Sequence, residues 1–325
     1  MPTSGESSAL PAFDGGFLGL SRSDVDISTR LAGLKLDSPL ILASGILGIS
    51  GKMLGRVAKE GVGAVVTKSF GTIARDGYPG PVMTEVAGGF LNSLGLPNPG
   101  AAAMVDEIIE AKRAGKPVFA SIYGFNENEY REAASFAGDA GANALELNIS
   151  CPHVEEVGVE IGQNPDLVAA VTKAAKSSFR GPVIVKLSPN VSSITEISAA
   201  AAKAGADALT AINTVKAMAI DIEAKRPILG GTFGGLSGPA LKPIALRCVY
   251  EIYEKVSLPI IGCGGIAGWE DIVEFLLAGA SAVQVGSALV DEDLQVFRHL
   301  IKGLGAYLSS HGYERLEEII GAAHI

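Results

Sequence analysis

Several residue types that mark whole classes of protein are rare in this sequence. Only three of the 325 residues are cysteine, at Cys151, Cys248 and Cys263, and none of them forms a CxxC pair. This argues against a disulfide framework and a cysteine-rich metal site, and it makes a reducing cytoplasm the expected location. The four histidines have no ligand-like spacing either, so we expect no bound metal.

Positive charge and long apolar runs are also scarce. The chain has 26 basic against 35 acidic residues, a net charge of -9, and no Lys/Arg cluster. A nucleic acid or an anionic membrane is therefore not expected as a partner. The N-terminal stretch "MPTSGESSALPAF" has neither the basic start nor the apolar core of a secretion signal. No apolar run reaches the roughly 20 residues of a membrane span, so the mean hydropathy of +0.33 indicates a large core.

What the sequence has instead is an alternation of short apolar runs and longer helical patterns. Near-continuous apolar runs are typical of parallel strands that are covered on both faces. Four stretches, "EGVGAVV", "AGANALEL", "AGADALTA" and "AGASAVQV", repeat a glycine at a helix end, a short turn and a strand. The expected strands are 39–44, 64–69, 117–123, 144–150, 182–188, 208–214, 259–265 and 282–288.

Eight such units predict an α/β protein with a closed (β/α)8 TIM barrel, and an open doubly wound sheet is the alternative. We expect one domain over residues 26–325, with no second domain. Residues 1–25 form a flexible or loosely docked extension in this prediction. Residues 31–40, "LAGLKLDSPL", are expected to make a hairpin that closes the floor of the barrel.

Active sites of TIM barrels lie where strands end and βα loops begin, so polar residues at the strand ends are candidates. The loop at residues 92–100 adds Asn92 and Asn98. Two lysines at the ends of separate apolar strands each need a partner, either a structural counter-charge or an anionic ligand. The candidates at the strand ends are Ser44, Lys68, Asn148, Cys151, Lys186, Asn213, Thr214, Gly264, Gly265, Gly286 and Ser287.

Glycines follow the last two expected strands, in "CGGIAGWEDI" and "VGSALV". TIM barrels often bind a phosphate group there, against backbone N–H groups. The position favours a cofactor that carries phosphate, although a "GG" pair also serves ordinary tight turns.

Cys151 differs from the other two cysteines in its place on the chain. Cys248 lies in a helical pattern and Cys263 in an apolar run, so both are expected to be buried packing residues. Cys151 follows a strand end and precedes Pro152. A thiol there can accept a proton near neutral pH if its surroundings favour the thiolate, and no hydrolytic triad accompanies it. Proton abstraction is therefore a better prediction than acyl transfer, and plain packing is the alternative.

Several of these pieces together resemble the dihydroorotate dehydrogenase family, from about Leu31 to Leu289. The segment "AIDIE…GGLSGPALKPIAL" is similar to class 1B, the catalytic FMN subunit that works with an FAD/iron–sulfur electron-transfer subunit. The resemblance implies a homodimer that associates with such a subunit and passes electrons to NAD. The matching pieces are "ASGILG", "VTKSFG", "NSLGLPNPG", "ELNISCP", "VKLSPN", "AINTV" and "GCGGI".

The resemblance also assigns roles to residues. Cys151 would remove the C5 proton of dihydroorotate while a hydride passes from C6 to N5 of FMN. The substrate would contact Lys68, Asn92, Gly95, Leu96, Asn148, Asn213 and Thr214. FMN would contact Ser44, Lys68, Asn148, Lys186, Ile212, Gly238, Gly264, Gly265, Gly286 and Ser287.

His153 departs from the family pattern, which usually has asparagine at this position. Dihydropyrimidine dehydrogenases, which reduce uracil and thymine, carry the same "SCPH". Reduction of a pyrimidine base is therefore the alternative function. A barrel without catalytic activity, which only binds a phosphorylated ligand, is a third alternative.

Overall fold

The eight apolar runs form a closed parallel barrel in the computed structural model of the chain, which describes residues 25–150 and 160–324. Each barrel strand pairs with the next one along the chain, and the last pairs with the first. The (β/α)8 prediction is confirmed, and the open sheet is wrong. The strands are β3 (Leu40–Leu42), β4 (Ala64–Val66), β7 (Val118–Ile122), β8 (Ala144–Asn148), β9 (Val183–Leu187), β10 (Ala208–Ala211), β15 (Ile260–Cys263) and β16 (Ala280–Val285).

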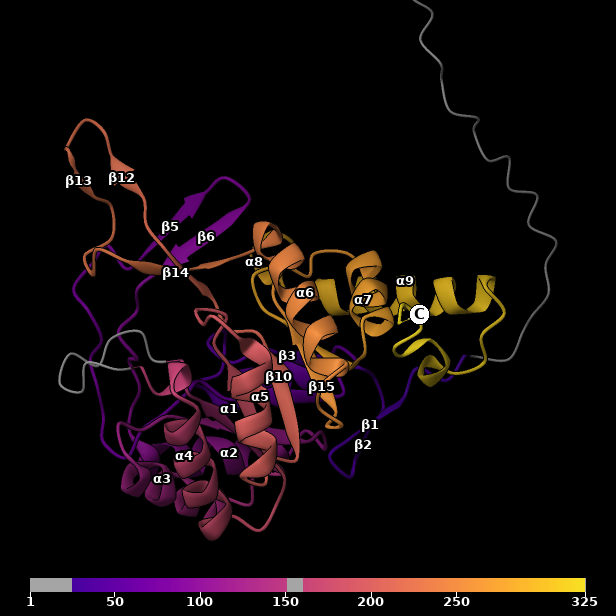
Figure 1. Ribbon diagram of the computed structural model, residues 1–325, viewed down its shortest axis with the longest axis horizontal. Coiled ribbons are helices and arrows are strands. Elements are labelled where there is room, and N and C mark those ends of the chain that lie inside the picture. Colours follow the sequence, from indigo (N-terminus) through magenta and orange to yellow (C-terminus); the bar gives the residue numbers. More distant parts are fainter. Residues whose placement is uncertain (1–24, 151–159, 325) are drawn as a thin grey trace, which may run out of the picture.

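Helices follow the strands and cover the outside of the barrel, as Figure 1 shows. Side-chain caps begin several of them, because Asn126, Asn164 and Ser193 each accept a hydrogen bond from a backbone N–H of the first turn. The α-helices are α1 (Gly51–Ala58), α2 (Ala101–Lys112), α3 (Glu127–Asp139), α4 (Pro165–Ser178), α5 (Ile194–Lys203), α6 (Lys242–Tyr253), α7 (Trp269–Leu277), α8 (Leu289–Glu292) and α9 (Gln295–Ser310). Three 3-10 turns are η1 (Ile161–Gln163), η2 (Pro239–Leu241) and η3 (Leu316–Ile319).

A hairpin closes the amino-terminal end of the barrel, as expected. Strands β1 (Thr29–Leu31) and β2 (Leu34–Leu36) pair antiparallel. Leu31 and Leu36 are fully buried in one apolar cluster with barrel residues that include Ile41 and Ile184. The opposite end, where the strands finish, is thereby left as the place for a ligand.

Two βα loops contain strands that the sequence did not reveal. Strands β5 (Met83–Val86) and β6 (Gly89–Asn92) follow β4, and β11 (Val215–Ala217) and β14 (Gly234–Ser237) follow β10. They form one antiparallel sheet in the order β11-β14-β6-β5, to one side of the barrel in Figure 1. A second hairpin, β12 (Ile220–Asp221) with β13 (Arg226–Pro227), extends beyond this sheet.

This sheet corrects the prediction that residues 92–100 are only a loop. Asn92 ends β6 and pairs with Gly235 of β14. The strands have only three or four residues each, which is too short for a pattern of alternation to be recognised, and β6 and β14 also contain glycine.

The expected extension, residues 1–25, lies outside the described residues except for Val25. Val25 packs against the barrel core. None of the helices in the described parts of the chain combines the length and the apolar character that a membrane span requires.

Candidate functional site

A cavity of ≈ 300 Å³ opens at the carboxyl ends of the barrel strands, beside the antiparallel sheet. It brings together candidates that lie as far apart in the chain as Ser44 and Ser287. Cys151 and His153 lie outside the described residues. The predicted residues that line the cavity are Ser44, Lys68, Asn92, Gly95, Leu96, Asn148, Lys186, Ile212, Asn213, Thr214, Gly238, Gly264, Gly265, Gly286 and Ser287.

Lys186 lies at the floor of this cavity, near the end of β9. Its Nζ donates a 2.8 Å hydrogen bond to Oε1 of Gln284 and lies 3.7 Å from Oε1 of the fully buried Glu146. Burial alone would lower the pKa of Lys186, but the acidic groups Cys263 and Glu146 beside the ammonium raise it. Burial raises the pKa of the Cys263 thiol, which favours its uncharged form.

Lys68 is the second lysine of the cavity, and its charge is not compensated in the same way. It is 8% exposed, and none of the ion pairs within residues 25–150 and 160–324 includes it. Burial lowers the pKa of Lys68. A buried ammonium in this position favours an anionic ligand, which would supply the missing counter-charge.

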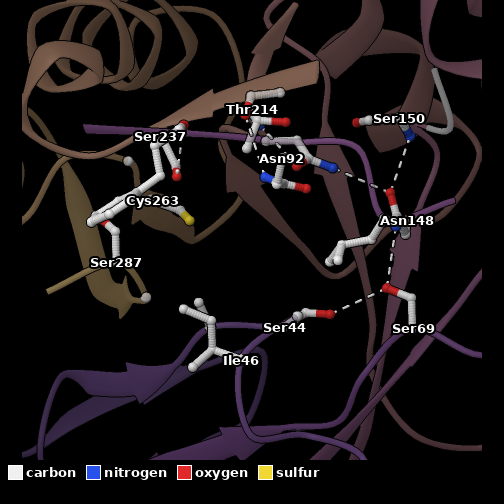
Figure 2. A pocket seen from close by; sticks show the side chains of 18 of the residues that line it. Ser44, Ile46, Ser69, Asn92, Asn148, Ser150, Thr214, Ser237, Cys263 and Ser287 are labelled. Carbon is white, nitrogen blue, oxygen red and sulfur yellow. Dashed lines mark hydrogen bonds between the residues drawn. The ribbon is translucent and has the colours of Figure 1, made fainter. Parts of the chain in front are cut away.

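Amide and hydroxyl side chains form a connected network along one wall, drawn in Figure 2. Asn148 is its centre, because its Nδ2 donates to Ser69 Oγ at 3.2 Å and its Oδ1 accepts from Asn213 Nδ2 at 3.2 Å. Ser69 also bonds to Ser44, with 3.2 Å between the hydroxyl oxygens. These contacts fix the amide orientations, so the wall presents defined donors and acceptors to a ligand.

Two asparagines of the 92–100 segment differ in their roles. Asn92 lines the cavity, and its Nδ2 donates to the Gly235 carbonyl at 3.3 Å. Asn98 is buried behind it and donates to the hydroxyl of Tyr123 at 2.8 Å. Asn98 is therefore a structural residue, since it does not belong to the cavity lining.

Glycines after β15 and β16 leave backbone N–H groups open to the cavity. The N–H groups of Gly264, Gly265 and Ser287 donate to no backbone carbonyl among the described residues. Gly265 has φ +78°, and a Cβ there would lie 2.5 Å from the backbone N of Lys242 at the start of α6. Only glycine fits this cradle without displacing backbone, and free N–H groups in such a cradle are suited to a phosphate.

The sequence reasoning missed several residues of the site. Cys263 was expected to be a buried packing residue, but it is the last residue of β15, is partly exposed and lines the cavity, whereas Cys248 is buried on α6 as expected. Gln284 and Ser69 also belong to the lining. The signal was present, because Glu146 and Gln284 are polar residues inside apolar strands.

The comparisons with known proteins match this geometry. The family model described as "Dihydroorotate dehydrogenase" matches residues 26–308. The chain belongs to the dihydroorotate dehydrogenase family. Members of this family are flavoproteins, and the cavity lies at the end of the barrel where TIM-barrel enzymes have their active sites.

Curated relatives in the family place the chain in class 1B. The chain is 50% identical over 297 residues to "Dihydroorotate dehydrogenase B (NAD(+)), catalytic subunit" of Pyrococcus abyssi, covering 91% of this chain and 99% of that protein. It is 51% identical over 296 residues to the protein of the same name from Methanosarcina mazei, covering 90% and 94%. These relatives favour the dihydroorotate dehydrogenase prediction over the pyrimidine-base alternative.

A solved structure supports the fold independently. The crystal structure of DHODH from Eimeria tenella in complex with ferulenol superposes with a TM-score of 0.81 at 24% identity. The match covers 95% of this chain and 92% of the other.

Proposed function

We propose that this dihydroorotate dehydrogenase family member is an FMN-dependent catalytic subunit that oxidises dihydroorotate to orotate in de novo pyrimidine biosynthesis. The observation that carries the proposal is the convergence of two buried lysines and three asparagines on one cavity at the barrel mouth. Lysines suit the carboxylate and phosphate groups of the ligands, and amides suit the donors and acceptors of a pyrimidine ring.

The described residues fit FMN. The N–H groups of Gly264, Gly265, Gly286 and Ser287 would hold its phosphate. Without side chains at the glycines, the phosphate can come close to the backbone. Lys186 would bind the polar edge of the isoalloxazine ring from the cavity floor. The remaining contacts would come from Ser44, Lys68, Asn148, Ile212 and Gly238, which line the same cavity. When bound, FMN supplies the hydride acceptor for the reaction.

The substrate would lie against the wall of amides. Lys68 would neutralise its carboxylate, which explains why a buried ammonium is kept without a counter-charge from the described protein. Asn92, Asn213 and Thr214 would bond to the ring amides, with further contacts from Asn148. The backbone of Gly95 and Leu96 would complete this subsite.

Cys151 is proposed as the general base that removes the C5 proton. This role rests on the resemblance and on the place of Cys151 three residues after Asn148, since Cys151 itself lies outside the described residues. The thiolate would accept the proton as the C6 hydride leaves, so that both C–H bonds break and a double bond forms between the two carbons.

The names of the relatives also suggest a partner. They are called catalytic subunits of an NAD(+) enzyme. We propose a cytoplasmic homodimer that associates with an FAD/iron–sulfur subunit, which would pass electrons on to NAD.

Anaerobic mixing of the purified protein with dihydroorotate, and separately with dihydrouracil, tests the function. Loss of the oxidised flavin absorbance with dihydroorotate alone is expected. Reduction by dihydrouracil alone would instead support the pyrimidine-base alternative, which His153 first raised. A protein that takes up no flavin would contradict both.

A further inference from the structure

A polar layer lies inside the barrel, between the apolar floor and the cavity. It consists of Glu146 on β8, Thr210 on β10 and Gln284 on β16, which are 0%, 0% and 1% exposed. Below it the interior is apolar, with residues such as Ile184 and Phe119. A carboxylate in the centre of a barrel is costly to bury, so its contacts need an explanation.

The contacts of Glu146 lead to two cavity residues, Lys186 and Gln284. Its Oε2 accepts a 3.0 Å hydrogen bond from Thr210 Oγ1 and another from Gln284 Nε2. Its Oε1 has no hydrogen-bond donor among the described residues and lies 3.7 Å from Nζ of Lys186. Gln284 contacts both members of this ion pair: its Nε2 donates to Glu146, and its Oε1 accepts a 2.8 Å hydrogen bond from Nζ of Lys186.

Glu146 itself does not line the cavity, whereas Lys186 does. Any effect of the carboxylate on a ligand must therefore pass through the two lining residues that it contacts, Lys186 and Gln284, and Gln284 in turn accepts a hydrogen bond from Lys186. Stability alone does not explain the layer, since replacing a buried ion pair by apolar residues of similar size is often neutral or stabilising. A fixed, charged donor at the cavity floor is what the arrangement provides.

We propose that Glu146 is a positioning residue for the cofactor: together with Gln284 it holds the side chain of Lys186 so that its ammonium points at bound FMN. The inference rests on the proposed function, because it takes FMN as the ligand above Lys186. Among the described residues, the other titratable side chains that line the cavity are Cys263, beside Lys186, and Lys68, Arg75 and Tyr78. Burial raises the pKa of Cys263 and so favours the uncharged thiol, whereas Glu146 also contacts Gln284, the second residue that holds Lys186.

A double-mutant cycle of FMN affinity tests the proposal. The dissociation constant is measured by quenching of flavin fluorescence between pH 7 and pH 10 for the wild type, E146Q, K186M and E146Q/K186M. Glu146→Gln keeps the size and an acceptor for Thr210 but removes the charge. We expect E146Q to bind FMN about 10-fold or more weakly, the loss of one charge-assisted contact, and to weaken further as the pH rises and Lys186 loses its proton.

The double-mutant cycle shows whether Glu146 affects FMN binding through Lys186 or only through the packing of the barrel interior. If Glu146 acts through Lys186, E146Q/K186M binds FMN no more weakly than K186M, and neither of these two variants has the extra pH dependence. Thr172→Val is the matched control, because it removes a buried hydrogen bond of α4 far from the cavity and should leave FMN affinity unchanged.

Two results would overturn the proposal. One is wild-type FMN affinity of E146Q at every pH, even if its free energy of unfolding changes. The other is an equal loss of affinity from E146Q in the K186M background. If E146Q does not fold, Thr210→Val takes its place, and wild-type affinity of that folded protein overturns the proposal.

The same samples distinguish this result from failure of the proposed function. A wild type that binds FMN but is not reduced by dihydroorotate refutes the proposed reaction and leaves the affinity cycle intact. A wild type that binds no FMN refutes both.

Discussion

At the scale of single residues, the cavity holds two lysines whose charges are balanced differently. Lys186 has Glu146 at 3.7 Å within the protein, and the acidic groups around it raise its pKa. Lys68 has no described acidic partner, and burial lowers its pKa. The charge of Lys186 is therefore balanced within the protein. The charge of Lys68 is unfavourable in the ligand-free protein, and an anionic ligand would balance it.

Lys68→Met tests this difference. Orotate should bind about 10- to 100-fold more weakly, because a hydrogen bond to a charged group contributes about 1.5–3 kcal/mol. The free energy of unfolding should stay level or rise by about 1 kcal/mol, because a buried ammonium is removed. Lys176→Met is the control, since Lys176 pairs with Asp207 outside the cavity and its loss should not change orotate affinity.

The pH dependence of Lys68 has a definite sign. With its pKa lowered by burial, the folded protein loses this proton at a pH where the unfolded chain still holds it. Stability therefore rises with pH between the lowered folded pKa and the ordinary lysine pKa. Urea unfolding of the ligand-free protein across this window should show a smaller rise for Lys68→Met, and an identical slope in both proteins would contradict the lowered pKa.

Cys151→Ala tests the proposed base. FMN affinity should be retained, while the rate of flavin reduction by dihydroorotate in a stopped-flow experiment should fall by about 10²–10⁴-fold. Cys248→Ala is the control, because Cys248 is buried on α6 and should not affect the rate. An unchanged rate in Cys151→Ala would mean that the thiol only packs.

At the scale of elements, the loop after β15 is held between two helices. Lys242, at the start of α6, pairs with Asp271 of α7 at 2.7 Å. Asp271 in turn accepts hydrogen bonds from the backbone N–H groups of Ala267 and Gly268, each at 2.8 Å. This fixes the chain that carries Gly264 and Gly265, so the cradle for the phosphate is formed before the ligand arrives.

A pair of glycine substitutions tests whether FMN binding and stability depend on the absence of a Cβ at Gly265. Gly265 and Gly33 have similar φ values, +78° and +84°, but a Cβ at Gly33 meets nothing within 4 Å. Gly33→Ala should cost about 1–2 kcal/mol of unfolding free energy from its backbone conformation alone, with normal FMN affinity. Gly265→Ala should cost more and weaken FMN binding by about 10-fold, through displaced N–H groups. Equal effects of the two substitutions would show that the contact with Lys242 is unimportant.

The sequence predicted the barrel elements better than the sheet beside them. Barrel strands are continuous apolar runs because both of their faces are covered, and this pattern is visible without coordinates. The expected runs extend past most of the strands because their last residues, such as Asn213 and Gly264, belong to the site loops. The sheet of β5, β6, β11 and β14 is joined by the pairing of β6 with β14, which come from two distant loops, and local patterns do not encode such a non-local contact.

At the scale of the whole molecule, an acidic protein encloses a positive cavity. The net charge is -9, yet the two lysines of the lining lie together at the barrel mouth. Both lysines could be predicted from the sequence, because they lie at the carboxyl ends of expected strands and a barrel brings all of these ends to one face. Cys263 and the layer of Glu146, Thr210 and Gln284 were missed. Side chains of a strand alternate between the inside and the outside of the barrel, and the sequence of a strand covered on both faces does not show which residues point inward.

A crystal structure of the protein with FMN and orotate tests the central claim most directly. The FMN phosphate is expected within hydrogen-bond distance of the N–H groups of Gly264, Gly265 and Ser287, with its ring beside Lys186. Orotate is expected between that ring and Lys68, with the Cys151 sulfur next to its C5. Density for FMN outside this cavity, or a Cys151 sulfur turned away from the orotate ring, would contradict the account.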